Sequence, residues 1–339
     1  MVSIKADKRI KQNNSKLTIW RNITSFREMN LIFIIIAVGI ALTIASSHFL
    51  TMDNLMSTAI GLAADGMIAV GMTVALVSGG FDLSVGSIMG LSGVTAAALY
   101  MNGMNIWLAC IIALLVGTSC GLLNGFFIGK IGLNSFITTL GIAGIARGAA
   151  YVVTQGSPIS LSGVDTSFNF IGQGKLMGIP FIVVVFIAIA IIGDFMMRRS
   201  EPLRKVFYTG SNEKAAILSG INTARIKMGV FILTATLSSL AGILSIARFT
   251  VATPTAGSGS EMRSISAAVI GGASLSGGEG TIFGAVLGVV LLNLINNGLI
   301  IMNVPVYYQD LVNGVMLIFA VTFDYVIHQK KKRKLKLKS

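Results

Sequence analysis

Residues 31–50 read LIFIIIAVGIALTIASSHFL and contain no Asp, Glu, Lys or Arg. A hydrocarbon core of about 30 Å needs about 20 apolar residues in an α-helix, so this run has full spanning length. A cleaved signal peptide is the alternative, because the preceding segment is basic and residues 45–47 are small. The run is longer than a signal-peptide core and further apolar runs follow, so we expect a retained membrane-spanning helix.

The composition extends this expectation to the whole chain. Of the 339 residues, 54% are hydrophobic and 12% are charged, and the mean hydropathy is +0.82. Soluble domains carry about 25% charged residues, so a soluble enzyme, a disordered segment and a nucleic-acid-binding domain are excluded. We expect an all-α integral membrane protein, a polytopic bundle of about ten transmembrane helices. The ten segments lie near residues 31–50, 54–78, 83–101, 105–129, 134–155, 180–197, 226–249, 262–276, 281–300 and 307–327.

Glycine shapes the junctions and the helix faces. The eighth segment is short, and glycine-rich junctions follow the second and eighth segments, so broken or re-entrant segments and nine or eleven crossings stay open. The same two junctions carry an internal echo, SGGFDLSVGSIMG at residues 78–90 and SGGEGTIFGAVLG at residues 276–288, with glycines at equal offsets. Glycines four residues apart, at 117 and 121 and at 125 and 129, predict close helix approach.

Basic residues predict the topology. The net charge is +13, and 21 of the 26 Lys and Arg residues fall within residues 1–30, 198–227 and 330–338. Cytoplasmic segments of membrane proteins are enriched in Lys and Arg, and ten crossings place all three clusters on one side. We therefore expect a basic cytoplasmic N-terminal segment at 1–30, a permease domain at 31–327 with a cytoplasmic segment at 198–227, and a basic cytoplasmic tail at 328–339. Attraction to anionic lipid is expected for the tail, and nucleic-acid binding is not.

Catalytic and metal motifs are missing from the sequence. Residues 125–130, GFFIGK, resemble a P-loop, but the spacing is one residue short and Ile131 replaces the Ser or Thr. The two histidines, His48 and His328, lie at opposite ends of the chain, so no histidine metal site is expected. The chain is expected to hydrolyse no ATP and to hold no metal.

Ionisable side chains at membrane depth are candidate functional groups. Asp65 lies well inside the second segment. The other candidates lie mostly near predicted ends or glycine breaks, and they are Asp82, Arg147, Arg248, Glu261, Glu279 and Asp310. A pathway role and a pairing with a neighbouring helix both stay open for Asp65.

Residues 208–222, YTGSNEKAAILSGIN, predict a short amphipathic helix between the sixth and seventh segments. Asn212 is a suitable N-cap, Glu213 follows in the first turn where the helix dipole favours a negative charge, and Gly220 is a suitable stop. Apolar residues from Ala215 to Ile221 are expected to form one surface, which fits either the membrane plane or the groove of a cytoplasmic partner.

Over about residues 53–325, the chain resembles the permease subunit of ribose-type ABC importers. The resemblance rests on four ordered groups of motifs and on Gln309 and Gly314. These are AVGMT at 69–73 with VSGGFDLSVGS at 77–87; FITTLG at 136–141 with Arg147 and Gly148; GSN at 210–212 with Ala215, Ala216 and 219–221; and Glu261, ISAAVIGG at 265–272, LSGG at 275–278 and Gly280.

The resemblance implies a type II importer fold, a second permease copy, a cytoplasmic ATPase that binds ATP and Mg, and an extracytoplasmic sugar-binding protein. It places the chain in the bacterial cytoplasmic membrane, with both termini cytoplasmic and no cofactor of its own. It also implies that the short helix couples to the ATPase through Ser211, Asn212, Glu213, Ala215, Ala216, Ser219, Gly220, Ile221 and Asn222. The signature and pathway candidates are Gly80, Asp82, Leu83, Ser84, Gly86, Arg147, Glu261, Gly271, Gly272, Gly277 and Gly278.

The cargo implied by the resemblance is a monosaccharide, moved by alternating access as ATP binding closes the ATPase halves. Two positions depart from the family pattern. Ser211 stands where the family commonly has a second Gly, and Asp65 falls where relatives are mostly apolar. An ion-coupled secondary carrier is the main alternative, and it predicts uptake by this chain alone through a carboxylate such as Asp65. A membrane anchor or receptor without transport is the third hypothesis.

Overall fold

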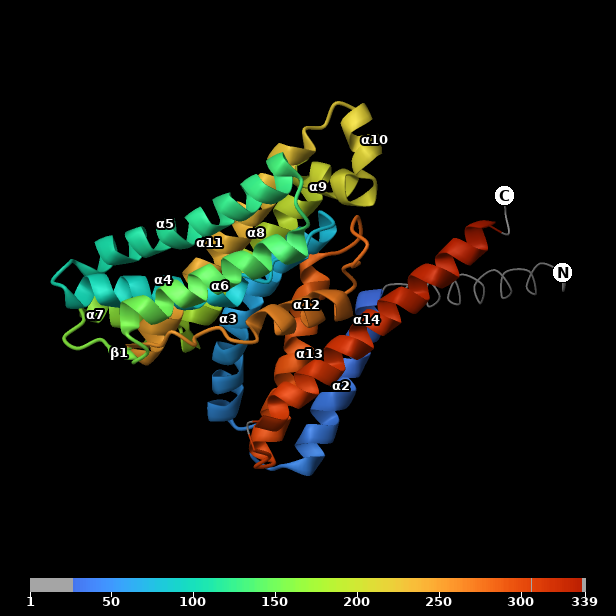
Figure 1. The fold of residues 1–339 in the computed structure, drawn as a ribbon. Helices are drawn as coiled ribbons and strands as arrows, with labels where there is room; N and C mark the ends of the chain where they lie inside the picture. Colours follow the sequence, from blue (N-terminus) through green and yellow to red (C-terminus); the bar gives the residue numbers. More distant parts are fainter. Residues whose placement is uncertain (1–26, 306, 337–339) are drawn as a thin grey trace, which may run out of the picture.

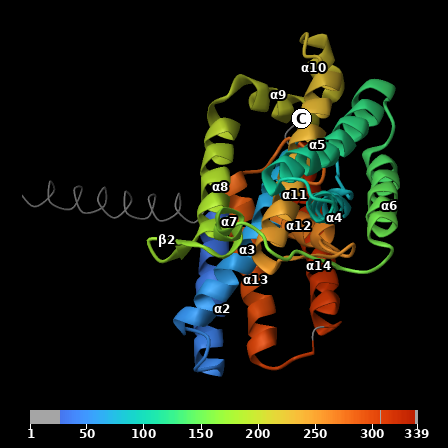
Figure 2. The same cartoon turned by 90° about the vertical axis from the view of Figure 1, so that its left-hand side faces the viewer.

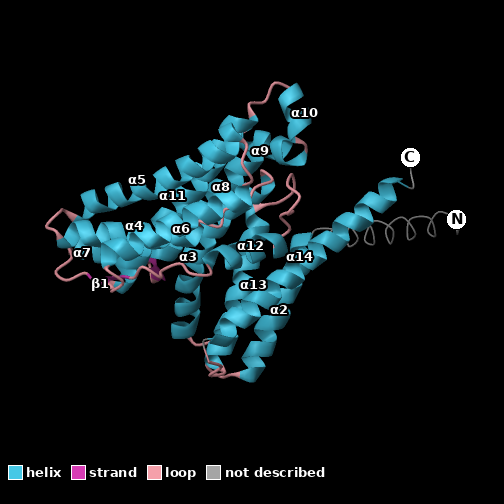
Figure 3. Ribbon diagram, in the orientation of Figure 1, coloured by secondary structure: helices cyan, strands magenta, loops and turns pink. Residues whose placement is uncertain are grey.

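The computed structural model describes residues 27–305 and 307–336. Most of the basic N-terminal segment and residues 337–339 lie outside the described part, as do the side chains of the lysine-rich tail, so its attraction to lipid stays a prediction. The described chain is helical apart from loops and two small antiparallel pairs (Figure 3). Strand β1 (Ile159–Ser160) pairs with β4 (Val251–Ala252), and β2 (Lys175–Leu176) pairs with β3 (Ile179–Pro180).

The helices follow the order of the apolar segments. They are α2 (Arg27–Ala45), α3 (Met52–Val77), α4 (Val85–Met101), α5 (Ile106–Gly125) with the π-helical η1 (Phe126–Ile131), α6 (Ser135–Thr154), α7 (Thr166–Gln173), α8 (Phe181–Arg199), α9 (Glu201–Ser211), α10 (Glu213–Leu218), α11 (Thr223–Phe249), α12 (Ser260–Ile270), α13 (Ile282–Ile301) and α14 (Tyr307–Lys336).

The predicted polytopic helical bundle is confirmed, and the eighth segment is short, as expected. Each of the ten apolar segments contains a helix, and eight helices among the described residues are long and apolar enough to cross a membrane. Helix α4 has 17 residues and α12 has 11. At 1.5 Å per residue α12 is about 16 Å long, about half of a hydrocarbon core.

The chain before α12 explains why this helix is short. Gly257 and Gly259 have φ values of +74° and +77°, a left-handed conformation that does not continue a helix. The non-helical segment 253–259 precedes α12, and it starts beside the β1–β4 pair at the end of α11. The residues after α12 lie at the opposite side, near Gly210 at the end of α9. Segment 253–259 and α12 therefore cross the bundle together. The chain still passes from one side of the membrane to the other as many times as the sequence predicts.

The segments next to the three basic clusters lie on one side of the molecule. Glu28, at the start of α2, accepts a hydrogen bond from the Thr281 hydroxyl (2.8 Å) beside the loop that reaches Gly210. Asp324, late in α14, accepts one from the Leu275 backbone in the same loop (3.3 Å). Helices α9 and α10 stand at this end, opposite α7 and β1 (Figure 1).

Helices α3 and α11 form the centre of the bundle, and about half of the residues of each are buried. The outer helices expose large apolar side chains, for example Ile44 on α2, Val152 on α6 and Ile318 on α14. A soluble protein would bury such side chains, whereas hydrocarbon is their favourable environment in a membrane.

The predicted close approach through small residues is confirmed at α5 and η1. Gly117, Gly121, Gly125 and Gly129 all face α11. A Cβ atom at Gly121 would lie 2.5 Å from the carbonyl oxygen of Phe231, closer than any side chain can fit. The glycines thus bring two helix backbones into contact, which gives the van der Waals packing that holds helices together in lipid.

We predict that Gly121→Val lowers stability, because the added methyl groups would push α5 away from α11. Overpacking of this kind costs about 1–3 kcal/mol. Thermal unfolding of the detergent-solubilised protein measures the effect. Gly39→Val on α2 is the matched control, since a Cβ there meets nothing within 4 Å. Equal melting temperatures for the two variants would contradict the packing assignment.

Candidate functional site

The predicted short helix forms with the predicted caps. The Asn212 side chain accepts a hydrogen bond from the Ala215 backbone N–H (3.0 Å) at the start of α10. Gly220 follows the helix with a φ of +82°, which ends it. Asn222 then caps α11 by accepting from the Arg225 backbone N–H (3.0 Å). Residues 211–222 are thus a defined cap–helix–cap unit between α9 and α11.

Helix α10 projects from one end of the molecule (Figure 1 and Figure 2). Its apolar residues do not form one surface as expected, because Ala216 is buried against the neighbouring helices while Leu218 is 89% exposed and Ile217 is 55% exposed. A salt bridge between Glu213 and Lys227 of α11 (2.6 Å) fastens the inner side. The exposed pair was not singled out from the sequence, because a six-residue helix does not reveal which face its neighbours cover.

Three of the signature residues gather at membrane depth. A Cβ on Gly86 of α4 would lie 2.6 Å from the Glu261 carboxylate, and one on Gly90 would lie 2.9 Å from the Arg147 guanidinium. Arg147 of α6 donates hydrogen bonds to the carbonyl oxygens of Pro254 and Ala256. The glycines of α4 therefore leave room for one carboxylate and one guanidinium beside segment 253–259.

The signature loop between α3 and α4 is held by its own polar residues. Asp82 is fully buried and accepts hydrogen bonds from the backbone N–H (3.0 Å) and the hydroxyl of Ser84. Asn124 of α5 donates to the Ser84 hydroxyl (2.9 Å), and Thr139 of α6 accepts from the Leu83 backbone (3.1 Å). Gly80 lies against the Phe231 ring of α11. These residues fix the start of α4 against three other helices.

The remaining signature glycines lie nearer the α10 side. Gly271 packs against Gly284, which brings the end of α12 against α13. Gly272 adopts a φ of +103° in the following turn. Gly277 and Gly278 lie beside Gly210. The predicted site residues therefore lie in three places: at membrane depth, in the loop before α4, and at the coupling end.

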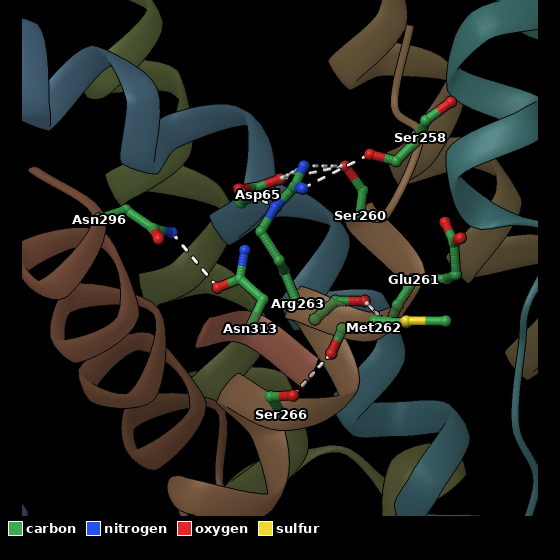
Figure 4. Close-up of polar contacts among 10 residues, drawn as sticks. Asp65, Ser258, Ser260, Glu261, Met262, Arg263, Ser266, Asn296 and Asn313 are labelled. Carbon is green, nitrogen blue, oxygen red and sulfur yellow. Dashed lines mark hydrogen bonds and ion pairs between the residues drawn. The ribbon is translucent and has the colours of Figure 1, made fainter. Parts of the chain in front are cut away.

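Asp65 is paired with a residue that the sequence did not single out. Its carboxylate lies 3.0 Å from the Arg263 Nε and accepts from the Ser260 hydroxyl (3.2 Å), as Figure 4 shows. Arg263 also donates to Ser260 (2.8 Å), and both charged side chains are about three-quarters buried. This contact joins α3 to α12 and corresponds to the pairing role that the sequence left open. Asp65 and Arg263 are 198 positions apart, so local pattern could not reveal the pair.

Comparison with known proteins settles the family. A family model described as "Branched-chain amino acid transport system / permease component" matches residues 51–321. The chain belongs to this permease family. The permease is 36% identical over 299 residues to the ribose import permease protein RbsC of Escherichia coli strain K12, covering 88% of this chain and 93% of that protein. RbsC of Bacillus subtilis strain 168 is 36% identical over 285 residues, covering 84% of this chain and 88% of the relative.

Other similar proteins have different sugars in their names. The D-allose transport system permease protein AlsC of Escherichia coli strain K12 is 36% identical over 300 residues, covering 87% of this chain and 91% of the relative. The L-arabinose transport system permease protein AraH of the same strain is 35% identical over 294 residues, covering 87% and 89%. No solved structure matches. The permease is therefore the multi-pass membrane component of an ABC importer and is not itself the catalytic subunit, which confirms the predicted resemblance.

We predict that the Asp65–Arg263 contact is energetically coupled. Either single alanine variant leaves an unpaired charge at membrane depth, and the double variant leaves none, so the double variant is more stable than additivity allows by about 1 kcal/mol or more. Unfolding of the four proteins in the cycle measures this.

The Glu201–Lys205 pair, joined at 2.8 Å but largely exposed, is the matched control cycle. Water and salt screen exposed pairs, which contribute little to stability, so this cycle is expected to be nearly additive. Equal coupling in both cycles would show that burial does not strengthen the Asp65 contact.

Proposed function

We propose that the chain moves a monosaccharide of the ribose, allose or arabinose type inward across the bacterial cytoplasmic membrane, as part of an ATP-driven importer. The observation that carries this proposal is similarity over nearly the full length to permeases named for three such sugars, of which the ribose relative is named an import permease. The description of the family model names amino acids, so the individual relatives, not the family, supply the sugar class. An external binding protein delivers the sugar, and a cytoplasmic ATPase supplies ATP and Mg chemistry.

Helix α10 is the element that would dock into the ATPase. Leu218 and Ile217 project from it as a small apolar surface, while the Asn212 cap and the Glu213–Lys227 bridge hold its inner side. Apolar anchors in a groove are the common way in which a short helix binds a partner. Ser219, Ile221 and Asn222 would position this surface, the buried Ala216 would space it from the helices beneath, and the exposed Ala215 would extend it.

The proposed orientation places α10 and both termini in the cytoplasm. The segments that adjoin the three basic clusters lie on one side. Since Lys and Arg mark cytoplasmic segments, this shared side is the inner one.

We further propose that the importer contains two copies of this chain, which meet at the face formed by α6, segment 253–259 and the start of α12. Non-helical backbone at membrane depth is tolerated only when protein or water covers it. Thr255 and Ser258 are exposed in this segment, next to the charged Arg147 and Glu261.

Helix α6 stands at the edge of the bundle (Figure 2), and its Gly141, Gly144 and Gly148 have nothing within 4 Å of a Cβ position. A second copy related by a two-fold axis would cover this uncovered glycine face and border a water-filled sugar path beside it. Uncharged sugars need few fixed charges along such a path.

We predict sugar uptake into proteoliposomes only when the permease, its ATPase, its binding protein and ATP are all present. Labelled D-ribose, D-allose and L-arabinose are the probes. Leu218→Asp should lower uptake at least about tenfold, because a charge replaces the exposed apolar anchor at the centre of the docking surface. Leu115→Asn, at an exposed position of α5 facing lipid, controls for loss of an exposed leucine.

Uptake by the permease alone, abolished by Asp65→Asn, would replace this proposal with the ion-coupled carrier. Recovery of the ATPase with the permease, but no uptake of any solute, would favour the anchor or receptor hypothesis. Normal uptake by Leu218→Asp would move the docking surface away from α10.

We predict that Ser258→Cys cross-links two copies through a flexible bis-maleimide, in a variant whose buried cysteines Cys110 and Cys120 are replaced by Ala. Leu115→Cys on the outer face of α5 is the control and should remain monomeric after denaturation. Denaturing gel electrophoresis separates the two outcomes. Cross-linking at 115 without cross-linking at 258 would place the second copy on another face.

A further inference from the structure

Three chain segments meet backbone to backbone on the α10 side of the molecule. They are the end of α3 at residues 77–79, the end of α9 at residues 210–211, and the loop after α12 at residues 277–278. The Gly278 N–H donates a hydrogen bond to the Val77 carbonyl oxygen (2.9 Å). We call this meeting point the glycine junction.

The glycine junction has no room for side chains at its centre. A Cβ on Gly210 would overlap the Val77 carbonyl oxygen and approach the Gly278 nitrogen to 2.9 Å. A Cβ on Gly277 would lie 2.7 Å from the Gly210 carbonyl oxygen and 3.0 Å from the Gly79 Cα. The Ser211 side chain packs directly against Gly278. The contacts are therefore between main chains, which cannot absorb a displacement by changing rotamers.

The junction also joins the two copies of the internal sequence echo. Gly79 and Gly277 occupy the same place in the two SGG motifs, at residues 78–80 and 276–278, and they lie against each other. Gly210 contacts both. The end of the segment that leads into α10 thus touches both echo loops, one at the end of α3 and one that connects α12 to α13.

These loops lead to the helices that carry the membrane-depth charges. Helix α3 carries Asp65, α12 carries Glu261 and Arg263, and the Asp65–Arg263 pair binds the two helices together. Only Asn212 separates α9 from α10, so movement of α10 reaches Gly210 through one short connection. Close-packed contacts transmit such shifts rather than damping them.

We propose that Gly210 is a positioning residue that transmits the displacement of α10 to α3 and to the α12–α13 loop together. This inference rests on the proposed function, because it needs a partner that moves α10. The ATPase cycle would then move α3 and the α12–α13 loop at the same time through the glycine junction. The sugar path would open or close as both move. Gly79, Gly277 and Gly278 serve as its receiving side.

The test is the amount of sugar moved per ATP hydrolysed in the reconstituted full importer. The probe is labelled D-ribose, or D-allose or L-arabinose if the wild type carries that sugar instead. Gly210→Ala should still bind the ATPase, since the exposed face of α10 is unchanged, and should still support ATP hydrolysis. Sugar moved per ATP should fall about tenfold, within the usual range of coupling between sites. Gly229→Ala on α11 is the control, because a Cβ there meets nothing within 4 Å.

Ser211→Leu is the second variant, used because Gly210→Ala could disturb folding. Ser211 is exposed, and its side chain is adjacent to Gly278. A larger side chain at this position would therefore press against Gly278 without entering the centre of the glycine junction. A lower ratio of sugar to ATP with normal assembly supports the proposal. An unchanged ratio in either folded variant, or an equal fall in Gly229→Ala, overturns it. Absence of ATP-dependent uptake by the wild type would instead overturn the proposed function.

Discussion

Contact between main chains is the interaction on which this structure depends. In lipid the hydrophobic effect does not drive helices together, so cohesion comes from close packing and from polar contacts. The glycines of α5 and η1 allow such contact along α11, and Gly271 and Gly284 do the same for α12 and α13. The Asp82–Ser84–Asn124 hydrogen bonds then fix the point where α4 enters the bundle.

Irregular backbone inside the bundle follows from the same packing. Segment 253–259 interrupts what would otherwise be a full span, and its carbonyl groups need donors that lipid cannot supply. Arg147 supplies two hydrogen bonds from α6, and glycines on α4 leave the space for them. The carbonyl groups of segment 253–259 thus satisfy the Arg147 guanidinium at membrane depth. Arg147 in turn stabilises this non-helical segment.

Local features of the sequence predicted local structure well. The apolar segments became helices, and Asn212 and Gly220 begin and end α10 as their side-chain chemistry and backbone freedom require. The eighth segment was expected to be short, but its end was expected near residue 276, whereas α12 ends at Ile270 because Gly271 and the left-handed Gly272 begin a turn there. The outward direction of Leu218 depends on α9 and α11 packing against the other face. The partner of Asp65 lies 198 positions away, so no local pattern reveals it. The repeated SGG motif likewise does not indicate that its two copies are in contact.

The exposed end of α10 has a consequence for the life of the subunit before assembly. Leu218 and Ile217 project from the tip of the molecule, where water rather than lipid surrounds them in the proposed orientation. An orphan copy therefore displays apolar surface to the cytosol, as misfolded proteins do, and chaperones and proteases bind such surface. The ATPase would hide it on docking. Subunit stoichiometry would then be kept by degradation of unpaired copies, and the lifetime of this chain in the cell would depend on how much ATPase is made with it.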